Sequence, residues 1–171
     1  MSQSRRRWIF VLGLVLCIFL DGVLSQLFSG LLFRPTVSAV PELTTLWLTC
    51  AAFFEDDTHL PTYWFAVGAG VVFDLFYMGY WGVYLFIFPV IVWLARILRQ
   101  YLPVNLFATL LVGFLSFGLQ PLLSWLALQV VGLTSATLTD FLVTALAPTL
   151  ALNEVLLVIL YWPVRQIYLN H

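Results

Sequence analysis

Charged residues are scarce in this chain, and their scarcity sets the class of protein. Of its 171 residues only 9% are charged, whereas 63% are hydrophobic and the mean hydropathy is +1.03. This composition is typical of an integral membrane protein. Because each span takes roughly 20 residues, the length allows about five or six helices and leaves no space for a soluble catalytic domain.

Basic residues, cysteine and histidine are also few. The seven basic residues are all arginines at the ends of apolar segments, so they form no basic face for nucleic acid. Cys17 and Cys50 fall inside apolar segments, and such isolated cysteines predict neither a disulfide nor a metal site. His59 and His171 lack any ligand or catalytic pattern. We therefore expect no enzyme activity, no cofactor and no metal.

Long apolar runs predict six transmembrane helices in one all-α domain that covers residues 1–171. Their expected ranges are about 8–33, 38–54, 61–78, 81–98, 104–133 and 140–163. The second is the weakest, because Pro41 and Glu42 suit either a helix start or a re-entrant segment. Pro121 predicts a bent or broken fifth helix.

The arginines predict how the helices are oriented. With six spans and a cytoplasmic N-terminus, six arginines face the cytoplasm and only Arg34 lies outside, as the positive-inside rule requires. Dropping the second span would move Arg96 and Arg99 outside. Both termini are therefore expected in the cytoplasm. The acidic connection at residues 55–59 would then be cytoplasmic, either as a solvated turn, which we favour, or as a contact for a partner.

Three acids fall in the interior of predicted spans, away from their end turns, at Asp21, Asp74 and Glu154, and no basic residue does. An ionisable group near the middle of a membrane helix costs on the order of 2.5–3.5 kcal/mol. Each acid is therefore expected to be protonated and hydrogen-bonded, or to face a water-filled cavity. A rise of about 1.5 Å per residue places Asp21 and Asp74 at a similar depth in the outer half, and Glu154 in the inner half.

Two interpretations of Asp21 and Asp74 follow. They predict either a proton relay or substrate pocket, or hydrogen bonds that tie helices together. For the second interpretation, which we favour, the expected partners are Ser25, Gln26, Tyr77 or another chain.

Small residues accompany Asp74 in the third predicted helix. Ala66, Gly70 and Asp74 are spaced four residues apart, so they share one helix face. This face is expected to pack closely against another helix. Gly79 and Gly82 follow and predict a tight hairpin to the fourth helix. The same spacing of small residues recurs in the sixth helix at Ala147 and Ala151.

The order of these motifs resembles the MreD family, the small membrane subunit of the bacterial rod-shape and peripheral cell-wall elongation system. The resemblance rests on Gly68-x-Gly70-x-x-x-Asp74 with the glycines that follow it, on Arg96-x-x-Arg99-Gln-Tyr-Leu, and on the stretch around Asp21 at residues 19–28.

Membership of this family implies a non-enzymatic scaffold in the bacterial plasma membrane. It implies binding to MreC, a single-span protein, and an indirect link to the MreB filament and to cell-wall synthases. It also allows the protein to form a homodimer. Gly68, Gly70 and Asp74 would lie on the family's most recognisable helix, with Asp21 as a second polar position.

The resemblance also supplies an alternative function. The MreD fold is thought to be similar to the substrate-binding subunits of energy-coupling-factor vitamin transporters, which also have six helices and both termini inside. Those subunits typically dock through Ala-x-x-x-Ala in their first helix, and the first helix here contains no alanine. This departure favours the scaffold over the transporter subunit.

Overall fold

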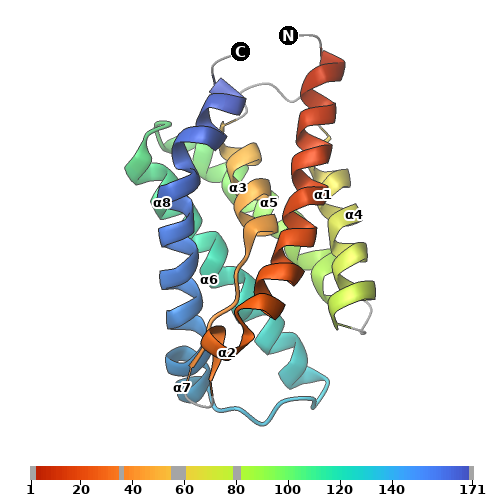
Figure 1. The fold of residues 1–171 in the computed structure, drawn as a ribbon, viewed down its shortest axis with the longest axis vertical. Coiled ribbons are helices and arrows are strands. Elements are labelled where there is room, and N and C mark those ends of the chain that lie inside the picture. The colour runs from red at the N-terminus through yellow and green to blue at the C-terminus, as the bar shows by residue number, and fades with distance from the viewer. Residues whose placement is uncertain (1–2, 35–36, 55–60, 79–81, 170–171) are drawn as a thin grey trace.

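The computed structural model describes residues 3–34, 37–54, 61–78 and 82–169, which are almost entirely helical (Figure 1). The elements are α1 (Gln3–Leu27), α2 (Ser29–Leu32), β1 (Phe33–Arg34), β2 (Val37–Ser38), α3 (Leu43–Phe54), α4 (Thr62–Phe73), the π-helical turn η1 (Asp74–Met78), α5 (Val83–Tyr101), α6 (Leu106–Val130), α7 (Leu138–Phe141), the π-helical turn η2 (Leu142–Leu146) and α8 (Ala147–Leu169). The predictions for Gly79 and for the acidic connection at residues 55–59 lie outside the described residues.

Four helical stretches are long and apolar enough to cross a membrane: Arg7–Leu27, Val83–Tyr101, Leu106–Val130 and Leu138–Tyr168. Two shorter apolar helices accompany them, at Leu43–Phe54 and Thr62–Tyr77. The all-helical membrane class predicted from composition is therefore confirmed. The start of α1 and the end of α8 lie at the same end of the bundle (Figure 1).

Helix α3 forms the centre of the molecule. All 12 of its residues are buried, and it packs against α1, α5, α6 and α8. At a rise of about 1.5 Å per residue it is only about 18 Å long, which is less than the roughly 30 Å of a bilayer core. The chain reaches α3 through residues 37–42, a non-helical segment that runs into the bundle (Figure 1).

The second helix therefore begins later than the sequence predicted. The expected range was 38–54, but the helix starts at Leu43. Proline disfavours helical geometry at the residue before it, so Pro41 keeps Val40 out of the helix. Glu42 stands at the cap position, where its carbonyl oxygen accepts the Leu46 N–H at 2.9 Å. The interpretation of Pro41 and Glu42 as a helix start agrees with this boundary.

Other boundaries differ from the expected ranges for local reasons. The first helix ends at Leu27, and α2 and a two-stranded hairpin follow, with Phe33 paired to Ser38. Helix α6 begins after Asn105, whose side chain accepts a hydrogen bond from the Ala108 N–H at 2.8 Å. It continues through Pro121 as one helix, so of the predicted bent or broken helix the break is wrong, and the bend stays a prediction. The last helical run extends from 138 to 169.

Helix α1 packs closely against α3 around one tryptophan. A Cβ atom placed on Gly13 would lie only 2.2 Å from the Trp47 ring, so glycine is needed there for the two helices to meet. The indole N–H of Trp47 donates to the backbone oxygen of Phe10 at 3.1 Å. This contact fixes α1 against α3. Another residue of α1 binds the start of α3, as described below.

Candidate functional site

Asp21 of α1 binds the start of the buried helix α3. Its Oδ1 accepts the backbone N–H of Leu43 at 2.6 Å, and its Oδ2 accepts that of Thr44 at 2.9 Å. The first N–H groups of a helix have no partner within the helix, and a carboxylate there is also favoured by the helix dipole. Asp21 is itself buried. A residue of α1 therefore caps a helix that begins inside the bundle.

Asp74 binds the start of helix α5. It lies at the first position of η1, and it is buried. Its carboxylate accepts the backbone N–H groups of Gly82 at 2.9 Å, Tyr84 at 2.9 Å and Leu85 at 3.1 Å. Gly82 has a φ of 102°, a left-handed conformation that glycine adopts readily. Asp74 therefore closes the α4–α5 hairpin by capping the first turn of α5.

The partners of both aspartates differ from those expected. The sequence pointed to Ser25, Gln26, Tyr77 or another chain, whereas both carboxylates bind backbone amides of a later helix in the same chain. The Tyr77 hydroxyl donates instead to the backbone oxygen of Ile18 in α1, at 2.7 Å. Each aspartate binds a different helix start, so the geometry does not join the two into one pocket or relay.

Helix α8 holds the extended segment that leads into α3. The Asn153 side chain accepts the Glu42 N–H and donates to the Val40 carbonyl, both at 2.8 Å. The Thr149 hydroxyl accepts the Val40 N–H at 3.2 Å. Non-helical backbone at membrane depth requires such partners, because lipid offers none. Two polar side chains of α8 thus make an extended chain possible inside the bundle.

A second layer of polar side chains lies around the same point. The Thr45 hydroxyl donates to the side-chain oxygen of Gln120 in α6, and both residues are buried. The Glu42 side chain is also buried, and its Oε2 has no hydrogen-bond partner among the described residues. Polar groups from α1, α3, α6 and α8 therefore surround the start of α3.

The small residues of α4 serve packing within the chain. A Cβ atom on Gly70 would lie 2.4 Å from the Tyr84 carbonyl oxygen and 2.7 Å from the Leu85 Cα. Ala66 is buried on the same face of α4. The expected close approach exists, and the helix that approaches is α5. Gly68 lies away from this contact, because a Cβ atom there would have nothing within 4 Å.

Glu154 of α8 differs from the two aspartates. Its Oε1 is buried but has no hydrogen-bond partner in the described part of the chain, while the residue as a whole is half-buried. A Cβ atom on Gly113 of α6 would lie 3.3 Å from this oxygen, so the carboxyl group lies beside the α6–α8 contact. Among the three predicted intramembrane acids, Glu154 alone accepts no backbone N–H group of a helix start in the described part of the chain.

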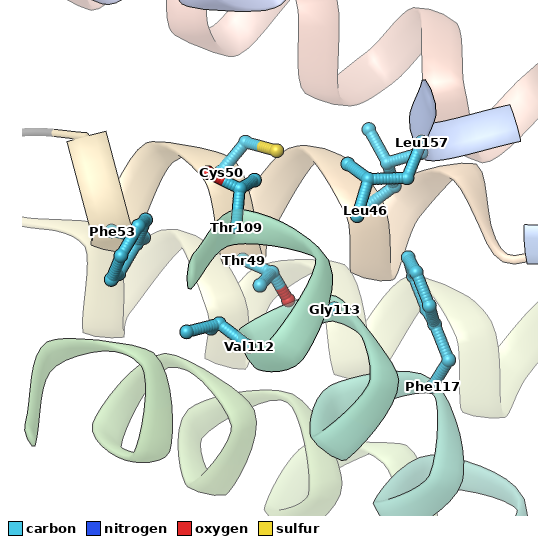
Figure 2. A pocket seen from close by; sticks show the side chains of 9 residues that line it. All are labelled: Leu46, Thr49, Cys50, Phe53, Thr109, Val112, Gly113, Phe117 and Leu157. Atoms are coloured by element: carbon cyan, nitrogen blue, oxygen red, sulfur yellow. The ribbon is translucent and has the colours of Figure 1, made fainter. Parts of the chain in front are cut away.

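One crevice lies between α3, α6 and α8, and Figure 2 shows the side chains that line it. It is almost wholly apolar and is nowhere wide enough to admit a water molecule. Its lining residues are Leu46, Thr49, Cys50, Phe53, Thr109, Val112, Gly113, Phe117 and Leu157. Within the described ranges, no three histidine, cysteine or acidic residues gather as metal ligands. Thr49 and Thr109 bring hydroxyl groups to this lining, but the crevice has no space for a solute.

Sequence reasoning missed Thr149, Asn153, Thr45 and Gln120. No local motif identifies them, because each bonds across more than 70 positions of sequence. The available signal was indirect: Pro41 marks a helix start within an apolar segment, and the N–H groups of a buried helix start need partners.

The comparisons with known proteins agree with the fold. A family model described as rod shape-determining protein MreD matches residues 4–170. Neither the curated proteins nor the solved structures give a match. The matched region covers all of the membrane-crossing helices together with the aspartates that cap α3 and α5. The chain therefore belongs to the MreD family of rod shape-determining membrane proteins.

Proposed function

We propose that this protein is a non-enzymatic membrane scaffold of the bacterial cell-shape and peripheral cell-wall elongation machinery. It binds MreC by packing of transmembrane helices and helps to position peptidoglycan synthesis, with MreB and the cell-wall synthases as indirect partners. The observation that carries the proposal is the family match over residues 4–170. A role in determining rod shape follows from that family, and the scaffold is the mechanism we propose for it.

The interior of the bundle supports a scaffold. Both oxygens of Asp21 and both oxygens of Asp74 are engaged by backbone N–H groups. These polar groups hold helices in place and are not available to a solute unless the helices separate. A rigid bundle with exposed apolar faces on α1, α5 and α8 suits helix packing in a membrane, where close van der Waals contact drives association.

We propose six membrane crossings with both termini in the cytoplasm of a plasma-membrane protein. The placement of the first and last helix ends at one end of the bundle supports this topology (Figure 1). The positive-inside distribution supports the same orientation. In this arrangement α3 and α4 are the short crossings, and the extended segment before α3 completes the second one.

The alternative was a substrate-binding subunit of an energy-coupling-factor transporter. A solute site needs a concave pocket with a few convergent polar groups. Among the described residues, the crevice of Figure 2 is narrow and apolar, and the intramembrane aspartates are engaged elsewhere. Neither this crevice nor these two aspartates, in the part of the chain that is described, favours transport.

Co-purification tests the scaffold. The protein and MreC are co-expressed, extracted in mild detergent and reconstituted in nanodiscs, with an unrelated single-span protein as the control partner. We expect a defined complex with MreC and none with the control. Failure to form that complex, with both proteins folded and monodisperse, would contradict the proposal. Light scattering of the protein alone reports whether it also forms a homodimer.

A further inference from the structure

The carboxyl group of Glu42 is buried at the start of α3, inside the bundle. The backbone of Glu42 is fully engaged: its N–H donates to the Asn153 side chain at 2.8 Å, and its carbonyl oxygen accepts the Leu46 N–H at 2.9 Å. The side chain is only 3% exposed, yet its Oε2 receives no hydrogen bond from any described residue. A buried polar atom without a partner is costly, and a buried unpaired charge is costlier still.

Asp21 lies beside Glu42 and already carries the negative charge of this site. Its two oxygens accept the N–H groups of Leu43 and Thr44, the residues that directly follow Glu42. The helix dipole favours an ionised carboxylate in that position. The two carboxyl groups are close enough to repel each other when both are ionised. No basic residue lies in the interior of the predicted spans to balance a second negative charge.

The other described polar groups around Glu42 stay neutral at physiological pH. On the α5 side Glu42 interacts with Tyr84, and a tyrosine hydroxyl ordinarily titrates at about pH 10. The acid of α8, Glu154, lies beside Gly113 at the α6–α8 contact. The remaining side chains that α6 and α8 bring to the start of α3 carry amide or hydroxyl groups, which do not titrate: Gln120, Ser124, Thr149 and Asn153. The charge of this site is therefore set by Asp21 and Glu42.

We propose that the Glu42 carboxyl group is a proton-binding site, occupied while Asp21 is ionised, and that the bound proton keeps the start of α3 closed. Keeping a proton on an ordinary glutamate at pH 7 is disfavoured by about 500-fold. Burial without a partner disfavours the ionised form by about 1,000-fold to 100,000-fold, so the neutral acid prevails. When the site opens to water, the O–H bond breaks, the proton passes to water and a carboxylate remains.

Carbon-13 NMR tests the proton directly. The chain contains three glutamates, so the double variant Glu55→Gln/Glu154→Gln leaves Glu42 alone. The labelled δ-carbon reports whether this carboxyl group is protonated while the full-length protein in detergent micelles is titrated through neutral pH. We expect the signal of a neutral acid at pH 7. Adding Asp21→Asn removes the neighbouring negative charge and should lower the pH of proton release by about one unit or more. Asp140→Asn, at an exposed acid, is the control and should leave the titration unchanged.

Hydrogen–deuterium exchange tests what the proton does for α3. The closed site holds a proton that the open site releases, so opening becomes more favourable as the pH rises, by up to about tenfold per pH unit. The exchange rates of the Leu43 and Thr44 amides in the wild type, divided by those in Glu42→Gln, should rise with pH to that extent. Glutamine has a similar shape and stays neutral, so this ratio removes the intrinsic pH dependence of exchange.

Each part of the proposal has a result that overturns it. An ionised Glu42 signal at pH 7 would show that the site holds no proton, and loss of the neutral-acid signal on addition of sodium at constant pH would show that a metal cation neutralises it instead. A titration that Asp21→Asn leaves unchanged would refute the coupling of the two acids. An exchange ratio that is constant with pH would refute the role of the proton in closing α3. The NMR measurement retains Glu42, so it tests the site even where Glu42→Gln fails to fold.

Discussion

Removal of the Asp21 carboxylate is the sharpest perturbation of this fold. The carboxylate is the partner of the first two N–H groups of α3, at 2.6 Å and 2.9 Å, and α3 is buried on every side. In Asp21→Ala both N–H groups lose their partner, and neither lipid nor water reaches them. In Asp21→Asn one oxygen acceptor remains, and the amide presents a donor to the other N–H.

The expected size of the effect follows from these two bonds. Each buried N–H left without a partner costs about 1–3 kcal/mol, so the loss of two partners in Asp21→Ala should lower the free energy of unfolding by about 2–6 kcal/mol. Asp21→Asn should lower it by about half as much, because it keeps one of the two bonds. The matched control is Asp140→Ala, because Asp140 is an exposed acid that bonds to Thr137 in its own turn. This variant should change the free energy of unfolding little.

Reversible unfolding in mixed SDS micelles measures these free energies, with tryptophan fluorescence as the signal. The order of stability should be wild type, then Asp21→Asn, then Asp21→Ala, with Asp140→Ala close to wild type. If Asp21→Ala unfolds with the same free energy as Asp140→Ala, then Asp21 does not hold the start of α3, and the structural role assigned to it fails.

Three further variants test other contacts in the same unfolding assay. Gly70→Ala places a methyl group against the backbone of α5 and should cost about 1–3 kcal/mol, whereas Gly68→Ala, which has open space, should not destabilise; equal effects would contradict the assigned α4–α5 contact. Asn153→Leu removes both hydrogen bonds to the extended segment and should cost about 2–4 kcal/mol; wild-type stability would show that α8 does not hold this segment. Trp47→Phe loses the bond to α1 and should cost about 1 kcal/mol beyond the lost packing, and no loss of stability would refute that bond.

The long helices were predictable from sequence because each contains its own signal. Uninterrupted apolar runs locate α5 and α6 to within about three residues and the start of the last helical run to within two, and Asn105 caps α6 from the adjacent position. The residues that determine each of these helices lie within the helix or directly beside it. Apolar length and local caps are therefore sufficient to locate it.

The start of α3 was not predictable in the same way. Its capping residue, Asp21, stands 22 positions upstream on another helix, and the segment before it is held by Asn153, more than 100 positions downstream. The same limit applies to Gly70: spacing shows that a helix approaches closely, but not which one. Only the folded chain identifies α5 as that helix. Contacts between distant segments carry this information, and a single sequence does not display them.

The central claim is that the intramembrane aspartates are caps for helix starts: Asp21 for α3, which begins inside the bundle, and Asp74 for α5 at the α4–α5 hairpin. Hydrogen–deuterium exchange of the Leu43 and Thr44 amides in nanodiscs measures this most directly, in the wild type and in Asp21→Ala. The account predicts slow exchange at both amides in the wild type, and exchange at least about tenfold faster in the variant, confined to the first turn of α3. Equal exchange at these two amides in both proteins would contradict it.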